Sequence, residues 1–164
     1  LQDTEVWNRA LSVPFLFGPG WSVIRVPSRA EGGTLRYPER IKPRDHCVVV
    51  LGASPKPTRY SFQAVKLLHD RGYRVIPVHP KAQRIDQIPA VRSLDVIREP
   101  VHTLTLYVGP ERSRHLIDDI VGLSPGRVIL NPGTESRDLE YALENGGVPY
   151  EHACTLVLLR TRQF

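Results

Sequence analysis

The sequence contains few cysteines and no long apolar run. Cys47 and Cys154 are its two cysteines, too few for a disulfide framework, and they favour a reducing, cytoplasmic compartment. They belong to no C-x-x-C pair, and the six histidines lack the spacing of metal ligands, so no metal site is predicted. No segment is apolar over the roughly 20 residues that a membrane-spanning helix needs, so we expect no membrane partner.

The chain also lacks a dense cluster of basic residues. Its 22 Lys and Arg residues outnumber its 17 Asp and Glu residues, which gives a net charge of +5 at pH 7. This balance favours anionic partners such as phosphates, nucleic acids or membrane surfaces. No run of basic residues is interleaved with aromatic residues, so nucleic acid is not the expected partner.

Residues 1–44 lack the pattern of a regular element. Glycine and proline recur through them, which excludes a long helix. The interpretation that we favour is an irregular N-terminal extension that lies on the surface or is partly disordered. The alternative is an arm that packs on a partner subunit through Trp7, Phe15, Phe17 and Trp21. We place the domain boundary between residues 44 and 45.

From residue 45 to residue 164, strand-like runs alternate with helical patterns. Residues 47–51 form a continuous apolar run, typical of a strand buried on both faces. A helix over residues 61–71 follows, with Ser61 as its N-cap and Gly72 at its end. Further strands are predicted over residues 73–78, 101–108, 127–130 and 148–150, a helical turn over 93–97, and helices from Pro110 and over 136–145. The pattern does not decide the type of the last apolar run, residues 155–159.

This alternation predicts an α/β fold of the Rossmann-like, doubly wound type. It would have a mainly parallel five-stranded sheet with helices on both faces. Such a sheet binds its ligand beyond the carboxyl ends of the strands, where the strand order reverses. We therefore expect a site built from the loops that follow Leu51, Val78, Val108 and Leu130.

The loop after the first strand, residues 52–61, combines a glycine, several hydroxyls and two cations. Gly52 allows a sharp turn and a close approach to a phosphate, and Lys56 and Arg59 supply positive charge. The helix that follows directs free backbone N–H groups to the same place, which favours an anion. Gly52 could instead serve only as a tight turn between strand and helix. We favour anion binding because several donors and both cations converge.

The dinucleotide fingerprint G-x-G-x-x-G is absent, because no further glycine follows Gly52 in this loop. The second strand also ends without the Asp or Glu that commonly binds the ribose hydroxyls of NAD. His79 and Lys81 stand there instead and suit a phosphate on the ribose, as in NADP or coenzyme A (CoA). Either residue alone is equally well explained as a turn residue or a solvated surface charge.

Four motifs follow one another with a characteristic spacing. They are Val-Val-Val-Leu-Gly-Ala-Ser-Pro ending at Pro55, Tyr-Arg-Val-Ile-Pro-Val-His-Pro ending at Pro80, Leu-Asn-Pro-Gly-Thr-Glu ending at Glu135, and Glu-His-Ala-Cys-Thr-Leu-Val-Leu-Leu ending at Leu159. With these motifs, residues 45–164 resemble the small CoA-binding-domain proteins of the YccU-like family. Those proteins are in turn similar to the CoA-binding domain of the succinyl-CoA synthetase alpha subunit. Residues 1–44 have no counterpart in the resemblance.

The resemblance implies a nucleotide-type ligand, CoA, held by four loops. The first loop would hold the pyrophosphate, and the second would border the adenosine and its phosphate. The third would line the adenine, and the last would face the exit of the pantetheine arm. The implied residues are Gly52, Ala53, Ser54, Pro55, Lys56, Arg59 and Tyr60; Val78, His79, Pro80 and Lys81; Tyr107, Val108 and Pro110; and Asn131, Pro132, Gly133 and Cys154.

The function expected from the sequence is binding of CoA or acyl-CoA, non-catalytic or regulatory. The alternatives are an NADP-dependent oxidoreductase, which would lack a second domain for its substrate, and an interaction protein with a vestigial nucleotide site. No catalytic residue is predicted. Cys154 lies two residues from His152, but we favour a buried structural cysteine; at the pantetheine exit it could form a mixed disulfide with the CoA thiol. A homodimer is compatible with the sequence, which indicates no interface.

Overall fold

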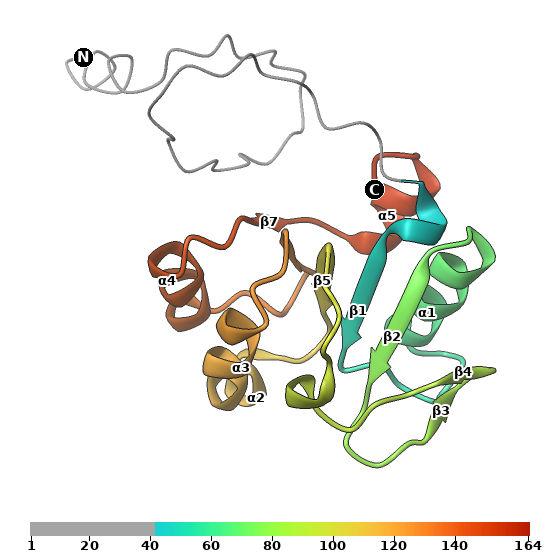
Figure 1. Cartoon of the computed structure of the whole chain (residues 1–164), viewed down its shortest axis with the longest axis horizontal. Helices are drawn as coiled ribbons and strands as arrows, with labels where there is room; N and C mark the ends of the chain where they lie inside the picture. The colour runs from blue at the N-terminus through green and yellow to red at the C-terminus, as the bar shows by residue number, and fades with distance from the viewer. Residues whose placement is uncertain (1–41) are drawn as a thin grey trace, which may run out of the picture.

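The computed structural model describes residues 42–164 (Figure 1). Five strands form one parallel sheet in the order β2-β1-β5-β6-β7. They are β1 (Cys47–Leu51), β2 (Arg74–Val78), β5 (Thr103–Leu106), β6 (Val128–Leu130) and β7 (Tyr150–His152). The predicted Rossmann-like α/β class is confirmed, and the strand order reverses between β1 and β5. The predictions for residues 1–41, including the four aromatic side chains of an N-terminal arm, lie outside the described residues.

The central strand β1 is buried along its whole length. Val49 and Leu51 pack into the apolar core on one face of the sheet. Val48 and Val50 pack into a second core on the other face. Successive side chains of a strand point to opposite faces, so a strand covered on both sides needs apolar residues at every position. Burial of β1 on both faces therefore explains the continuous apolar run in the sequence.

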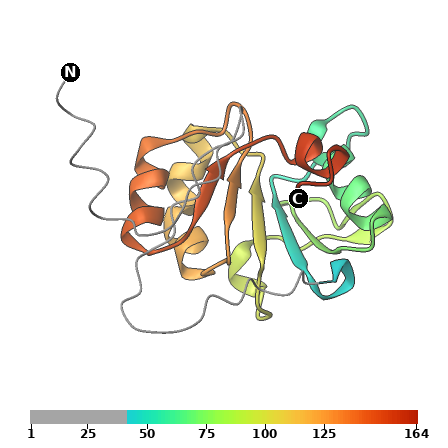
Figure 2. The same ribbon diagram turned by 90° about the horizontal axis from the view of Figure 1, so that it is seen from above.

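One face of the sheet is covered by α1 (Tyr60–Asp70) and α5 (Thr155–Arg160) (Figure 2). Leu68 of α1 and Leu159 of α5 are both fully buried in the core on this face. The guanidinium of Arg71 donates to the backbone carbonyl of Leu159 and joins the ends of the two helices. The last apolar run is therefore a helix. Its six residues are too few for a period of 3.6 to be distinguished from a buried strand.

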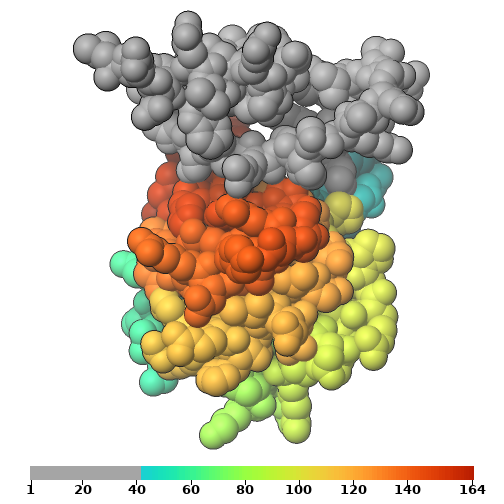
Figure 3. All heavy atoms as spheres, turned by 90° about the vertical axis from the view of Figure 1, so that its left-hand side faces the viewer, coloured from blue at the N-terminus to red at the C-terminus, as the bar shows by residue number. Residues whose placement is uncertain are grey.

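The opposite face is covered by a layer of short helices (Figures 2 and 3). They are α2 (Pro110–Ser113), the 3-10 turn η4 (Arg114–Leu116), α3 (Ile117–Gly122) and α4 (Arg137–Asn145). Pro110 takes the first helical position, as predicted. The predicted single helix is interrupted at Leu116, whose φ of −116° and ψ of 4° depart from helical values before α3 begins. Within residues 42–164, no helix has the length and apolar character needed to cross a membrane.

The segment after β2 folds into a small hairpin that the sequence analysis did not predict. It consists of β3 (Arg84–Ile85) and β4 (Ile88–Pro89), followed by the 3-10 turn η3 (Leu94–Val96), where a helical turn was expected. The N–H of Val91 donates to the carbonyl of Pro77 at 2.9 Å, and the N–H of His79 donates to the carbonyl of Val91 at 2.9 Å. The segment thus covers the carboxyl-terminal half of the edge strand β2.

Two local predictions were wrong. The N-cap of α1 is Arg59, and Ser61 lies buried in the first turn of the helix, where it caps nothing. The last strand begins at Tyr150 instead of at residue 148. The N–H of Val148 donates to the carbonyl of Leu143 at 2.9 Å, so this residue completes the end of α4 before the strand starts.

Candidate functional site

The loops that follow the parallel strands meet at the carboxyl edge of the sheet. The backbone N–H groups of Gly52 and Ala53 both donate to the carbonyl of Val78 at 3.2 Å, which ties the first loop to the end of β2. The N–H of Tyr107 donates to the carbonyl of Leu51 at 2.8 Å, which ties the third loop to β1. The structure thus brings these loops side by side along one edge.

Gly52 is required where the first loop passes the third. Its φ of +87° lies in the left-handed region, which glycine adopts without strain. A Cβ atom here would lie 2.7 Å from Cγ1 of Val108 and 3.0 Å from the carbonyl carbon of Tyr107. Gly52 therefore has a packing role in addition to its turn. The contact lies between β1 and β5, at the reversal of strand order where doubly wound sheets bind ligands.

The N-terminus of α1 carries uncompensated positive charge. Its N-cap, Arg59, makes no side-chain capping bond, and its first turn contains no acidic residue. Lys56 and Arg59 are both exposed. The hydroxyl of Ser54 accepts a hydrogen bond from the N–H of Lys56 at 3.3 Å, which curls the loop toward the helix. An eleven-residue helix that begins beside two exposed cations favours an anion at this position.

The loop after β2 is shaped by the imidazole of His79. Its Nδ1 accepts hydrogen bonds from the backbone N–H groups of Lys81 and Ala82. Two donors at Nδ1 require this nitrogen to be unprotonated, so a neutral ring carries its hydrogen on Nε2 and can donate from there. The side chain of Lys81 is exposed beside it. The second loop therefore adds a ring donor and a cation to the edge.

The third loop brings Tyr107 near Cys154. The Tyr107 hydroxyl is buried, and burial raises the pKa of Tyr107 to about 12. Cys154 is half-buried at the N-cap of α5 and close enough to influence this phenol. Nε2 of His152 lies 3.7 Å from Oε1 of Glu140 on α4.

The predicted site residues differ in how far they reach the surface. Exposed are Pro55, Lys56, Arg59, Tyr60, Pro80, Lys81, Pro110, Pro132 and Gly133; half-buried are Gly52, Ser54, His79, Tyr107, Val108 and Cys154; buried are Ala53, Val78 and Asn131. The buried members shape the loops, whereas the exposed and half-buried ones are available to a ligand. Asn131 in particular bonds through its amide only within the protein.

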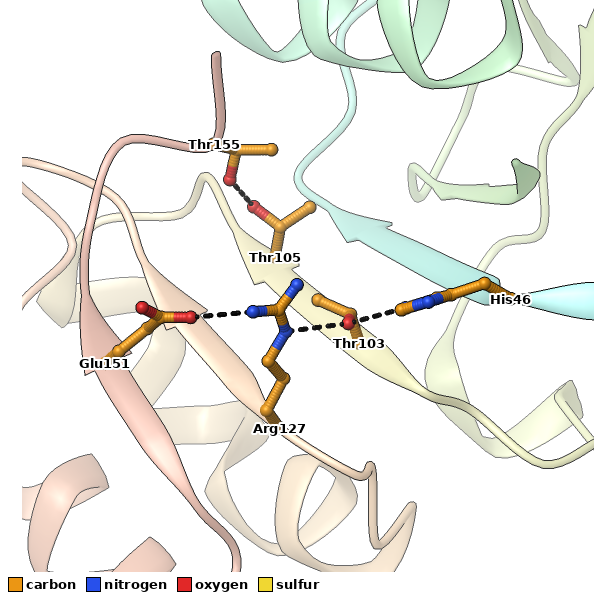
Figure 4. Close-up of polar contacts among 6 residues, drawn as sticks. All are labelled: His46, Thr103, Thr105, Arg127, Glu151 and Thr155. Atoms are coloured by element: carbon orange, nitrogen blue, oxygen red, sulfur yellow. Dashed lines mark hydrogen bonds and ion pairs between the residues drawn. The ribbon is translucent and has the colours of Figure 1, made fainter. Parts of the chain in front are cut away.

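A second polar cluster, which the sequence analysis missed, lies toward the amino edge of the sheet on the face that carries α5 (Figure 4). Nε2 of His46 is 2.9 Å from Oγ1 of Thr103, and Nε of Arg127 donates to the same oxygen at 3.0 Å. Nη1 of Arg127 also donates to Oε1 of Glu151 at 3.0 Å. Burial, with the charge of Arg127, lowers the pKa of His46 to about 4. These residues come from four separate segments, so no sequence motif could have indicated the cluster.

The parallel sheet, with its reversal of strand order between β1 and β5, defines a Rossmann-like α/β domain with positively charged loops at its switch point. Residues 46–160 match the model of a protein family described as the CoA binding domain, and the chain belongs to this family. The family resemblance predicted from the sequence motifs is thereby confirmed.

Individual relatives agree with this assignment. Over 81 residues the chain is 32% identical to the uncharacterized protein YneT of Bacillus subtilis, a match that covers 49% of this chain and 56% of YneT. The chain thus spans little more than half the length of this curated relative. A crystal structure of an uncharacterized protein shares 36% identity and a TM-score of 0.68, covering 73% of this chain and 98% of the other. A Thermus thermophilus protein shares 31% identity and a TM-score of 0.67, covering 73% and 90%.

A more distant structure shows how widely the fold is used. The dinucleotide-forming acetyl-coenzyme A synthetase 1 of Ca. Korarchaeum cryptofilum, in complex with phosphate and ADP, has a TM-score of 0.58 at 18% identity. The match covers 67% of this chain and 25% of the synthetase. At this identity the likeness concerns the fold alone.

Proposed function

We propose that this chain binds CoA or an acyl-CoA at the carboxyl edge of its sheet and acts as a binding or regulatory module without catalysis of its own. The observation that carries the proposal is the uncapped N-terminus of α1 with Lys56 and Arg59 beside it, in a chain of the CoA-binding domain family. This position would receive the pyrophosphate, because free N–H groups and two cations favour a doubly charged anion.

The end of β2 supports a ligand with a phosphate on its ribose. His79 presents a ring donor and Lys81 a cation, where a ligand with free ribose hydroxyls would call for a carboxylate. CoA carries such a phosphate at the 3′ position and NADP at the 2′ position. Family membership favours CoA, and NADP is the second candidate.

The residues assigned to the proposed site are groups that bind a ligand, which supports the non-catalytic role. A reactive thiol at Cys154, the N-cap of α5, would need a base beside it. Nε2 of the neighbouring His152 lies 3.7 Å from Oε1 of Glu140 on α4. Within residues 42–164, the site therefore offers groups that bind and orient a ligand more readily than groups that transform it.

Calorimetric titration and thermal unfolding with CoA, 3′-dephospho-CoA and NADPH test the proposal. At about 100 times its dissociation constant a ligand stabilises the fold by roughly 2.7 kcal/mol, which raises the unfolding midpoint by several degrees. We expect CoA to produce the largest shift and dephospho-CoA a smaller one. A larger shift with NADPH would favour the oxidoreductase alternative, and no shift with any of the three would refute a nucleotide site.

Two lysine variants localise the binding. Lys56→Ala removes a charge proposed to contact the pyrophosphate and should weaken CoA about tenfold, since a hydrogen bond to a charged group contributes about 1.5–3 kcal/mol. Lys66→Ala is the control, because Lys66 is an exposed lysine within α1 whose side chain pairs with Asp70 at 3.4 Å near the other end of the helix. Lys81→Ala should lower affinity for CoA more than for dephospho-CoA. Equal effects of Lys56→Ala and Lys66→Ala would place the ligand elsewhere.

A further inference from the structure

The side-chain amide of Asn131 joins three elements at the carboxyl edge. Its Nδ2 donates to Oγ1 of Thr105 at 2.8 Å and to the carbonyl of Leu106 at 3.0 Å, and its Oδ1 accepts from the N–H of Thr155 at 2.8 Å. The carbonyl of Leu106 can only accept and the N–H of Thr155 can only donate, so chemistry fixes the orientation of the amide. Both amide hydrogens are used within the protein, and none is left for a ligand.

The network around Asn131 is closed to water. Asn131 is 3% exposed, and Thr105 and Thr155 are 0% exposed. The two threonine hydroxyls lie 2.6 Å apart (Figure 4), and the hydroxyl of Thr134 donates to the carbonyl of Asn131 at 2.8 Å. A buried hydrogen-bond network of this kind favours a single arrangement of its members. It connects the ends of β5 and β6 to the first residue of α5 and fixes the loop over residues 131–134.

This loop differs from the first two loops in having no cation, and the carboxylate of Glu135 accepts a hydrogen bond from the N–H of Gly133 within it at 2.7 Å. Residues 131–134 are Asn-Pro-Gly-Thr, whereas Lys56, Arg59 and Lys81 belong to the loops after β1 and β2. Adjacent strands lie about 4.8 Å apart, so the end of β6 is about 10 Å from the end of β1. CoA has its charge at the phosphorylated nucleotide and continues as a long, uncharged pantetheine arm. A ligand with phosphates at α1 would place such an arm, which needs no cation, along this loop.

We propose that Asn131 is a positioning residue for the uncharged arm of the ligand. It makes no contact with the ligand through its amide and acts by holding residues 132–134 and the start of α5 along the path of the arm. This inference rests on the proposed CoA-binding function. It predicts that breaking the network lowers the affinity for a ligand with the arm and leaves the affinity for the charged nucleotide alone unchanged.

The test compares CoA with adenosine 3′,5′-bisphosphate, a nucleotide that lacks the arm, by calorimetric titration of the full chain. Asn131→Ala and Thr105→Val each break the network, and Thr105→Val does so with almost no change in shape. Both variants should bind CoA about tenfold more weakly and leave the bisphosphate within about twofold of its original affinity. The controls are Asn145→Ala, an exposed asparagine at the end of α4, and Thr103→Val, a buried threonine of the same strand outside the network.

Equal weakening of both ligands by the network variants would overturn the inference, because it would show a general structural role. Unchanged affinity for CoA would overturn it as well. If Asn131→Ala does not fold, Thr105→Val decides the question alone. The unaltered protein is measured first: binding of neither ligand to it would refute the proposed function itself, which separates that failure from a failure of the role given to Asn131.

Discussion

Nδ1 of His79 lies 2.7 Å from the backbone nitrogen of Ala82 and accepts a hydrogen bond from it. The same atom accepts from the N–H of Lys81 at 3.0 Å. The imidazole therefore closes the loop after β2 as the side chain of an Asn or Asp closes an Asx turn. The loop proposed to receive the phosphorylated ribose is shaped before any ligand arrives.

Replacement of His79 tests this turn directly. His79→Ala removes the acceptor for two backbone N–H groups and should lower the free energy of unfolding by about 1 kcal/mol, since each hydrogen bond contributes about 0.5–1.5 kcal/mol and water can replace part of it. His79→Asn supplies a carbonyl oxygen at a similar place and should recover most of the loss. Urea unfolding of the three proteins measures the difference. An asparagine variant no more stable than the alanine variant would contradict this role.

Gly52→Ala should destabilise the fold by about 2 kcal/mol or more. The new Cβ would meet Val108 at 2.7 Å, and the φ of +87° costs an alanine about 1–2 kcal/mol by itself. Gly122→Ala is the matched control, because a Cβ on Gly122 in α3 meets nothing within 4 Å. It should leave stability unchanged or raise it by up to about 1 kcal/mol. Urea unfolding measures the change in stability of both variants. Equal changes would show that neither the close contact nor the positive φ of Gly52 excludes a side chain.

Acidic pH should lower the free energy of unfolding through the protonation of His46. Its pKa is about 4 in the folded chain and near 6.5 in an unfolded one, so the unfolded state binds the proton more readily between these values. The contribution of neutral His46 is complete above about pH 6.5, falls as the pH drops, and is exhausted below about pH 4. The charges that face His46 are those of Arg127 and His102, and both disfavour its protonation.

Urea unfolding from pH 4 to pH 7 measures this dependence. In the His46→Gln variant the slope of the unfolding free energy against pH should decrease by the equivalent of up to about one proton. His69→Gln, at an exposed histidine on α1, should leave the slope unchanged. The same slope in the His46→Gln variant and the parent protein would contradict the lowered pKa of His46 in the folded chain.

The two thiols should differ strongly in reactivity. Cys47 is 2% exposed, and burial together with the nearby carboxylate of Glu99 raises its pKa to about 11. Cys154 is half-buried at the start of α5. A thiol reagent at pH 8 should therefore modify Cys154 in the folded protein and Cys47 only after unfolding. Peptide mass analysis identifies the modified residue, and the Cys154→Ala variant should show no fast phase; fast modification of Cys47 would contradict the structure.

The strongest sequence patterns predicted the elements that the structure contains. The continuous apolar run before Gly52 indicated a strand buried on both faces, and β1 is one. The hairpin of β3 and β4 escaped prediction because each strand has only two residues, too few to show alternation. Ser61 was misplaced as a cap because a serine near a helix start has the same local signature whether its hydroxyl faces the helix end or the core.

The candidate site was predicted in outline by the same reasoning. A doubly wound sheet brings the ends of its strands to one edge, so the loops after Leu51 and Val78 could be placed together without coordinates. The sequence did not predict the role of each side chain. Asn131 was expected to face the ligand, whereas its amide is buried and bonded to Thr105 and Thr155, which are distant in sequence.

The sequence by itself determined the alternation of strands and helices, the positive charge of the first loop and membership of the CoA-binding domain family, because these depend on local composition, period and motif order. Only the tertiary structure decided which polar groups turn inward. The pairing of Arg127 with Glu151 joins two strands, and the amide of Asn131 reaches a helix 24 residues later. Such contacts depend on how the layers pack, because a polar group buried by that packing must find its partner among whatever the fold brings beside it.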